Sequence, residues 1–152
     1  MNSEALKKTA HLFCKDHLHA RLTRIHGEIN KITEALQTET KSSAGDKHET
    51  GRAMLQLERE KLGTRLAEVE NMNRVFSKVP THKTGVKIGL GSFFQTDKHF
   101  YYVAISAGIC EIEDYKVFCV STQTPIGKAA LGKSEGESFV VNGISQHIIK
   151  IV

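Results

Sequence analysis

Two stretches of the chain carry apolar residues at alternating intervals of three and four. The first contains Leu18, Leu22, Ile25, Ile29, Ile32 and Leu36, and the second contains Leu55, Leu62, Leu66, Val69 and Phe76, with Arg59 and Asn73 in two of its places. This spacing is typical of a helix that packs along one narrow stripe against another helix. Helices joined by a short connection run antiparallel, so we expect a coiled-coil hairpin with about 30 residues, or about 45 Å, in each arm.

Glycine and proline divide the chain into two parts. Residues 1–78 have no proline and four glycines, whereas residues 79–152 have both prolines and eight of the twelve glycines. The second part is also richer in β-branched runs. The sequence therefore predicts an α+β protein, with a coiled-coil hairpin over residues 1–78, an acidic tip near residues 43–51, and a small β-rich domain over residues 79–152.

The second part contains runs that alternate as strands do, separated by glycines and charged residues. Five strands are expected, within GVKIGLGSFFQ, HFYYVAIS, YKVFCVST, SFVVNG and QHIIKIV. Between the third and fourth runs, Pro125 is placed to begin a short helix that continues to Leu131. The five aromatic residues Phe93, Phe94, Phe100, Tyr101 and Tyr102 are expected in the core and in strand pairs.

Composition excludes some classes of protein. The 152 residues carry a net charge of +4, which permits contact with nucleic acid without requiring it. The three cysteines form no CxxC pair, so zinc-ribbon and thioredoxin-like sites are not indicated, and a reduced, cytoplasmic location is expected. No run is long and apolar enough for a signal peptide or a membrane span.

The break between the two seams reads SAGDKHETG and contains two carboxylates, Asp46 and Glu49. Local sequence alone favours a helix start, with Asp at the N-cap and Glu three residues later. Residues three apart are also neighbours on one face of a helical turn, so the pair can present oxygen ligands together. Carboxylate oxygens are the ligands that Mg²⁺ prefers. Capping and metal binding are compatible, and both interpretations stay open at this point.

The order of these parts resembles the bacterial Gre transcript-cleavage factors. The tip of that family reads approximately G-D-L-S-E-N, and a later signature reads approximately S-P-[IL]-G-[KR]-A-L-[LI]-G-K. Here Gly45, Asp46 and Glu49 match the first, and TPIGKAALGK, beginning at Thr124, matches most of the second. The later motif is the more specific one, and the resemblance covers almost the whole chain.

The resemblance implies a hairpin followed by a domain similar to the FKBP fold. It also implies a factor that binds bacterial RNA polymerase through the secondary channel and stimulates cleavage of backtracked RNA at the nascent 3′ end. The factor would be no enzyme by itself and would have no cofactor of its own. Asp46 and Glu49 would assist a Mg²⁺ shared with the polymerase active site, and only within that complex. A monomer and no membrane partner are expected.

The same resemblance implies two contact regions. At the tip, Lys47, His48 and Arg52 are candidates for contact with RNA or polymerase. In the globular domain, Pro125, Ile126 and Lys128 are candidates for docking on the rim of the channel, with a buried turn as the alternative for Pro125 and Ile126. The many basic residues of the hairpin suit either an RNA path or a solvated coiled-coil face, since acids are interleaved with them.

The tip departs from the family pattern after Glu49. The family commonly has an acidic residue where this chain has Arg52. The reversed charge keeps a second hypothesis open, a channel-binding regulator that inhibits or modulates polymerase without stimulating cleavage. A plain coiled-coil interaction protein is a third. His11, His17 and His19 raise the question of a metal site, but no third ligand accompanies them at a convincing spacing.

Overall fold

The computed structural model describes residues 1–41, 46–82 and 85–152, and it describes the side chains of these residues except 40, 41 and 46–48. Within them the chain forms two compact units. One consists of residues 18–73, and the other combines residues 1–17 with residues 74–152. The predicted α+β class, an N-terminal helical hairpin followed by a β-rich domain, is confirmed.

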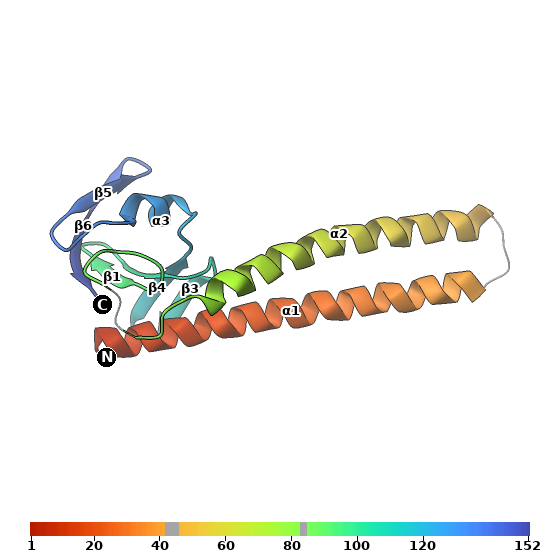
Figure 1. The fold of residues 1–152 in the computed structure, drawn as a ribbon, viewed down its shortest axis with the longest axis horizontal. Coiled ribbons are helices and arrows are strands. Elements are labelled where there is room, and N and C mark those ends of the chain that lie inside the picture. The colour runs from red at the N-terminus through yellow and green to blue at the C-terminus, as the bar shows by residue number, and fades with distance from the viewer. Residues whose placement is uncertain (42–45, 83–84) are drawn as a thin grey trace. The chain divides into compact units, whose positions relative to one another are not determined.

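Residues 18–73 contain most of two long helices, α1 (Ser3–Lys41) and α2 (Asp46–Ser77), which lie side by side and antiparallel (Figure 1). Both predicted seams are on the inner faces. Five of their members are buried, namely Leu18, Ile25, Ile32, Leu62 and Val69, and Leu22, Ile29, Leu36, Leu55 and Leu66 are half-buried. Within this unit the two helices pack only against each other in the part of the chain that is described. Burial of the two stripes is therefore the main apolar contribution to the stability of the hairpin.

The second seam differs from its prediction at the two places assigned to Arg59 and Asn73. Asn73 is exposed, and its neighbour Met72 is half-buried instead. The Met72 sulfur accepts a hydrogen bond from Arg21 Nη1 at 3.2 Å, so the long side chains of both helices fill this position. Arg59 is also exposed, as expected of a charged side chain that cannot be paired within an apolar seam.

The β-rich part of the described chain is one six-stranded sheet in the order β3-β4-β2-β1-β6-β5. The strands are β1 (Phe93–Thr96), β2 (Phe100–Val103), β3 (Gly108–Ile112), β4 (Tyr115–Val120), β5 (Ser138–Val141) and β6 (Ile144–Ile151). Only β2 and β4 pair in parallel. The other neighbours are antiparallel, including two tight hairpins, β3–β4 and β5–β6.

The prediction of five strands was wrong by one strand. It missed β3, because Glu111 and Glu113 were interpreted as charged separators. Glu111 is an exposed residue of the strand, and Glu113, with a φ of 52°, lies in the turn that leads into β4. The first predicted run also begins too early: the strand starts at Phe93, after Gly91 has taken a φ of 89° that extended strands do not adopt.

The sheet has an apolar core on each face. Consecutive strand residues point to opposite faces, so Tyr101 and Tyr102 belong to different cores. The first core contains Ile88, Phe94, Tyr101, Val103, Ala130, Phe139 and Ile148 and lies under α3 (Pro125–Ala130). The first turns of α1 bury Leu6, Ala10 and Cys14, and His11 on the same turns bonds to Tyr102. The expectation that the aromatic run serves the core is confirmed.

The short helix α3 begins at Pro125 as predicted and ends one residue early, at Ala130. Thr124 caps it, since its hydroxyl accepts a hydrogen bond from the Gly127 amide at 3.1 Å and donates one to the Ser121 carbonyl at 2.8 Å. Gly127 is required by space: a Cβ there would lie 1.9 Å from the Ser121 carbonyl oxygen. Two residues of the TPIGKAALGK motif thus have a structural role in this fold.

Candidate functional site

The acidic tip lies at the start of α2. The helix begins at Asp46, so Asp46 and Glu49 belong to its first turn. Glu49 is exposed, which leaves its carboxylate oxygens accessible to a partner. Gly45 and the side chains of Asp46, Lys47 and His48 lie outside the described residues. The predicted pairing of the two carboxylates therefore stays a prediction.

Arg52 follows Glu49 by three residues and is half-buried. Its side chain has an interaction partner in the structure. Residues three apart on a helix share one face, so Arg52 adds a positive charge on the face that carries Glu49. Arg52 thus changes the electrostatic character of the tip.

A third carboxylate lies near the tip and was not anticipated. Glu39 of α1 faces Gly51 of α2, and a Cβ at Gly51 would lie 3.7 Å from Glu39 Oε1. At this distance a Cβ at position 51 would make an ordinary van der Waals contact with Glu39, so the approach of the two helices does not require glycine. Sequence spacing contained no signal for it, because the contact depends on the register between the helices. Among the described residues, no three histidine, cysteine or acidic side chains group closely enough to hold a metal ion.

The proposed docking residues share one short helix of the globular unit. Pro125 and Lys128 are exposed, whereas Ile126 is half-buried against the apolar core under α3. Ile126 therefore helps to anchor the helix. Pro125 and Lys128 are three residues apart and form neighbouring parts of its outer surface. The alternative of a buried turn does not apply to Pro125, which is exposed, and Ile126 is half-buried within the helix.

The three candidate metal histidines do not act together. His11 packs within the globular unit: its ring stacks on Phe76 with centroids 4.7 Å apart, and its Nδ1 lies 2.8 Å from the Tyr102 hydroxyl. His17 is half-buried and engaged, and His19 is exposed.

All three cysteines are free and buried, Cys14 on α1, Cys110 on β3 and Cys119 on β4. A hydrogen bond with Cys14, together with burial, raises the pKa of the Cys119 thiol. Burial also raises the pKa of Cys110. Buried thiols with a raised pKa are poor nucleophiles, so Cys110 and Cys119 act as small apolar side chains of the core. The same hydrogen bond with Cys119 lowers the pKa of Cys14.

Comparisons with known proteins give one solved structure to report. The chain is similar to GreA factor homolog 1 of Thermus thermophilus, with 20% sequence identity over 90% of this chain and 93% of that one, and a TM-score of 0.36. No family model matches the chain, and no curated protein matches its sequence. No helix in the described residues is long and apolar enough to cross a membrane. Assignment to a family therefore depends on the motifs of this chain.

Proposed function

We propose that this chain is a Gre-like transcription factor that inserts its hairpin into the secondary channel of a bacterial RNA polymerase and stimulates cleavage of backtracked RNA. The observation that carries the proposal is the position of the GDxxE sequence at the start of α2, where the chain turns between two long antiparallel helices. The TPIGKAALGK motif, which forms the capped helix α3, supports the same family.

The chain would act in trans. Asp46 and Glu49 would hold a Mg²⁺ that the polymerase site also coordinates. In phosphodiester cleavage such an ion supplies an activated water and stabilises developing charge. Glu49 fits this role, because it is exposed and offers hard oxygen ligands. Two carboxylates would fill only part of the coordination shell of a Mg²⁺, so binding would depend on further ligands from the polymerase and from water.

A second contact would be made by α3. The exposed Pro125 and Lys128 would dock on the rim of the channel, and Lys128 would pair with an acidic surface there. Ile126, which is half-buried, would support the helix from below. Two contacts on one chain raise the effective concentration of each, so loss of either would weaken binding.

Arg52 favours one alternative. A factor that binds the same channel but leaves cleavage unstimulated would explain a cation next to Glu49, because the guanidinium would neutralise one ligand of the shared metal. The alternative predicts slowed transcription with no released 3′ fragment. Reversal of the charge, Arg52→Glu, would then convert an inhibitor into a stimulator.

The test uses stalled, backtracked elongation complexes from the source organism, with Mg²⁺ and labelled RNA. The unaltered factor should accelerate release of short 3′ fragments. Asp46→Asn or Glu49→Gln should reduce that acceleration at least about tenfold, as expected for loss of a group that positions a metal. Glu68→Gln is the matched control, since it removes an exposed carboxylate from the same helix far from the tip.

Three outcomes distinguish the hypotheses. Cleavage that depends on both tip carboxylates supports the proposal. Inhibited transcription without cleavage supports the channel-binding regulator instead. No binding to polymerase contradicts both and leaves a coiled-coil protein whose tip is only a capped turn.

A further inference from the structure

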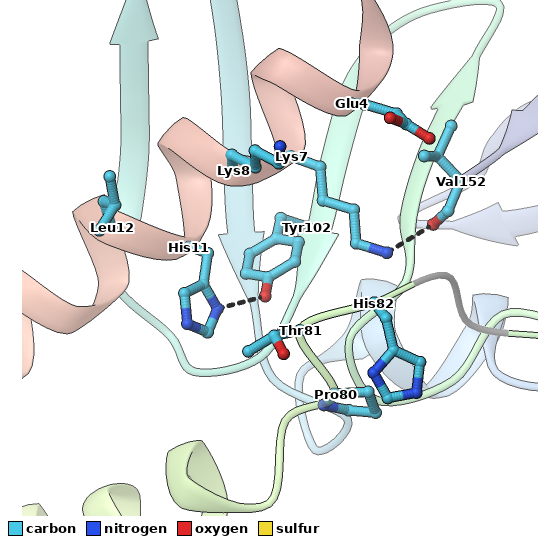
Figure 2. A pocket seen from close by; sticks show the side chains of 10 residues that line it. All are labelled: Glu4, Lys7, Lys8, His11, Leu12, Pro80, Thr81, His82, Tyr102 and Val152. Atoms are coloured by element: carbon cyan, nitrogen blue, oxygen red, sulfur yellow. Dashed lines mark hydrogen bonds between the residues drawn. The ribbon is translucent and has the colours of Figure 1, made fainter.

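The globular unit contains a pocket of about 430 Å³ that the proposed function does not use. It is bounded by the first turns of α1, by residues 80–82 and by β2 (Figure 2). Its lining residues are Glu4, Lys7, Lys8, His11, Leu12, Pro80, Thr81, His82, Tyr102 and Val152. All belong to the unit of residues 1–17 and 74–152. A volume of this size lies within the range of small-molecule sites.

Lys7 is the least expected residue of this pocket. Lys7 is only 9% exposed, and its Nζ donates a hydrogen bond to the main-chain oxygen of Val152 at 3.1 Å. An ammonium has three donors, and this is the one hydrogen bond that Lys7 Nζ makes to described residues. Burial lowers the pKa of Lys7, and the nearby charge of Glu4 offsets this only in part. An ammonium that makes one hydrogen bond to the described residues keeps donors for a further partner.

His11 provides a second polar group on the same side. Burial, then the charges of Lys15 and Lys7, lower its pKa, while burial raises the pKa of Tyr102. These two shifts favour a neutral imidazole whose Nδ1 accepts a hydrogen bond from the Tyr102 hydroxyl over 2.8 Å. The proton of the imidazole then resides on Nε2, which remains a donor.

The pocket has basic residues at its edge and apolar side chains along its walls. Lys8 and His82 are exposed at its edge, and Glu4 is the one acidic residue of the lining. Leu12, Pro80 and the ring of Tyr102 supply apolar wall. Figure 2 shows the side chains of Lys7, His11, Thr81 and His82 around the same space, with α1 above it.

We propose that this pocket binds a small amphipathic anion, a phosphate or carboxylate group attached to an apolar or aromatic body. The anionic group would accept hydrogen bonds from Lys7 Nζ, with Lys8 and His82 adding long-range attraction. The apolar body would lie against Leu12, Pro80 and Tyr102. A metal ion is a poorer occupant, because no three possible ligands group together among the described residues. The proposal is independent of any action on polymerase.

The test titrates the whole chain with phenyl phosphate, benzoate and phenol, followed by calorimetry and by NMR of the histidine side chains. We expect the two anions to bind and phenol, which has the same ring without the charge, to bind at least tenfold more weakly. Comparison of phenyl phosphate with benzoate decides which anionic group the site prefers. Shifts should include His11 and His82 and leave His147, on β6 and outside the pocket lining, unchanged.

Two substitutions test the role of the charge. Lys7→Met keeps the apolar stem and should abolish the preference for anions over phenol, while the midpoint of urea unfolding stays the same or rises because a buried charge is removed. Lys8→Gln alters an exposed side chain and should weaken anion binding several-fold without affecting folding. Lys150→Gln, an exposed lysine of β6 outside the pocket, is the control and should change nothing.

The pH dependence has a definite sign. None of the residues that face or neighbour His11 supplies a negative charge at neutral pH; these residues are Lys7, Lys15, Phe76 and Tyr102. A bound anion favours the protonated imidazole and so raises the pKa of His11. Affinity should therefore increase as the pH falls through the range in which His11 titrates. Equal binding of phenol and the anions, equal loss in Lys150→Gln, or no binding at millimolar concentration would each overturn the proposal.

Discussion

The hairpin unit and the globular unit bury their apolar residues in different ways. In residues 18–73 the buried apolar side chains all belong to one seam between two helices. In the globular unit the sheet is covered on both faces, and the side chains of Phe94, Val117 and Ile148 are fully buried. The exposed faces of the hairpin can therefore carry charged residues at little cost to folding. In the globular unit, close packing restricts which side chains fit at the buried positions.

This difference separates the two family-like motifs. The more specific motif, TPIGKAALGK, contains residues that the fold itself requires, namely Thr124 and Gly127. The weaker motif, GDxxE, has an exposed Glu49 at the start of a helix. TPIGKAALGK, which resembles the Gre pattern more specifically, thus contains residues with a structural role. GDxxE, which contains the proposed metal-binding carboxylates, is a short pattern and the less specific of the two.

The largest expected effect is on the globular core. Phe94→Ala should lower the free energy of unfolding by about 3–5 kcal/mol, because it removes a fully buried ring from the core under α3. All three tyrosines lie in this unit, so tyrosine fluorescence monitors its unfolding, while circular dichroism at 222 nm is dominated by the helices. Ile25→Ala in the seam is the comparison. If it shifts the tyrosine transition as much as Phe94→Ala does, the contrast between the units is wrong.

The next effect concerns a glycine that the globular fold requires. Gly127→Ala should destabilise the protein by about 2 kcal/mol, because the added methyl group overlaps the Ser121 carbonyl oxygen and forces α3 to shift. Gly89→Ala is the control, since a Cβ there would meet nothing within 4 Å. Urea unfolding curves of both variants measure the difference. An unchanged midpoint for Gly127→Ala would mean that α3 can move without cost.

The same substitution should have the opposite sign in the hairpin. Gly63 is an exposed position within α2, and a Cβ there would meet nothing within 4 Å. Gly63→Ala should stabilise the helix by about 0.5–1 kcal/mol, because alanine loses less backbone entropy on folding. Thermal melting followed at 222 nm measures the gain. A loss of stability would indicate that Gly63 has a packing role that the contacts of this unit do not include.

Much of the architecture could be predicted from the sequence, for reasons that differ between elements. The seams were readable because a heptad pattern depends only on the helix period, and Pro125 marked the start of α3. Strand β3 was missed because Glu111, on an exposed strand face, looks the same in sequence as a charged residue of a loop. Local patterns do not contain the pairing of β3 with β4 that makes it a strand.

The candidate sites follow the same rule. Asp46 and Glu49 could be proposed because their spacing and their place between the seams are properties of the sequence. Glu39 could not, because its approach to Gly51 depends on the register between two helices. The pocket of Lys7, His11 and Tyr102 was also invisible, since it brings together segments about 90 residues apart along the chain or more.

The hydrogen bond from Lys7 to Val152 spans 145 positions of sequence. Synthesis therefore exposes the first turns of α1 long before the strands that cover Leu6, Ala10 and Cys14 have left the ribosome. The hairpin seam, by contrast, is complete once residue 76 has emerged. Domains fold as units during synthesis at about 5–20 residues per second, so the amino-terminal apolar stripe waits several seconds for its partners. Until those partners emerge, the apolar side chains of Leu6, Ala10 and Cys14 remain exposed to solvent.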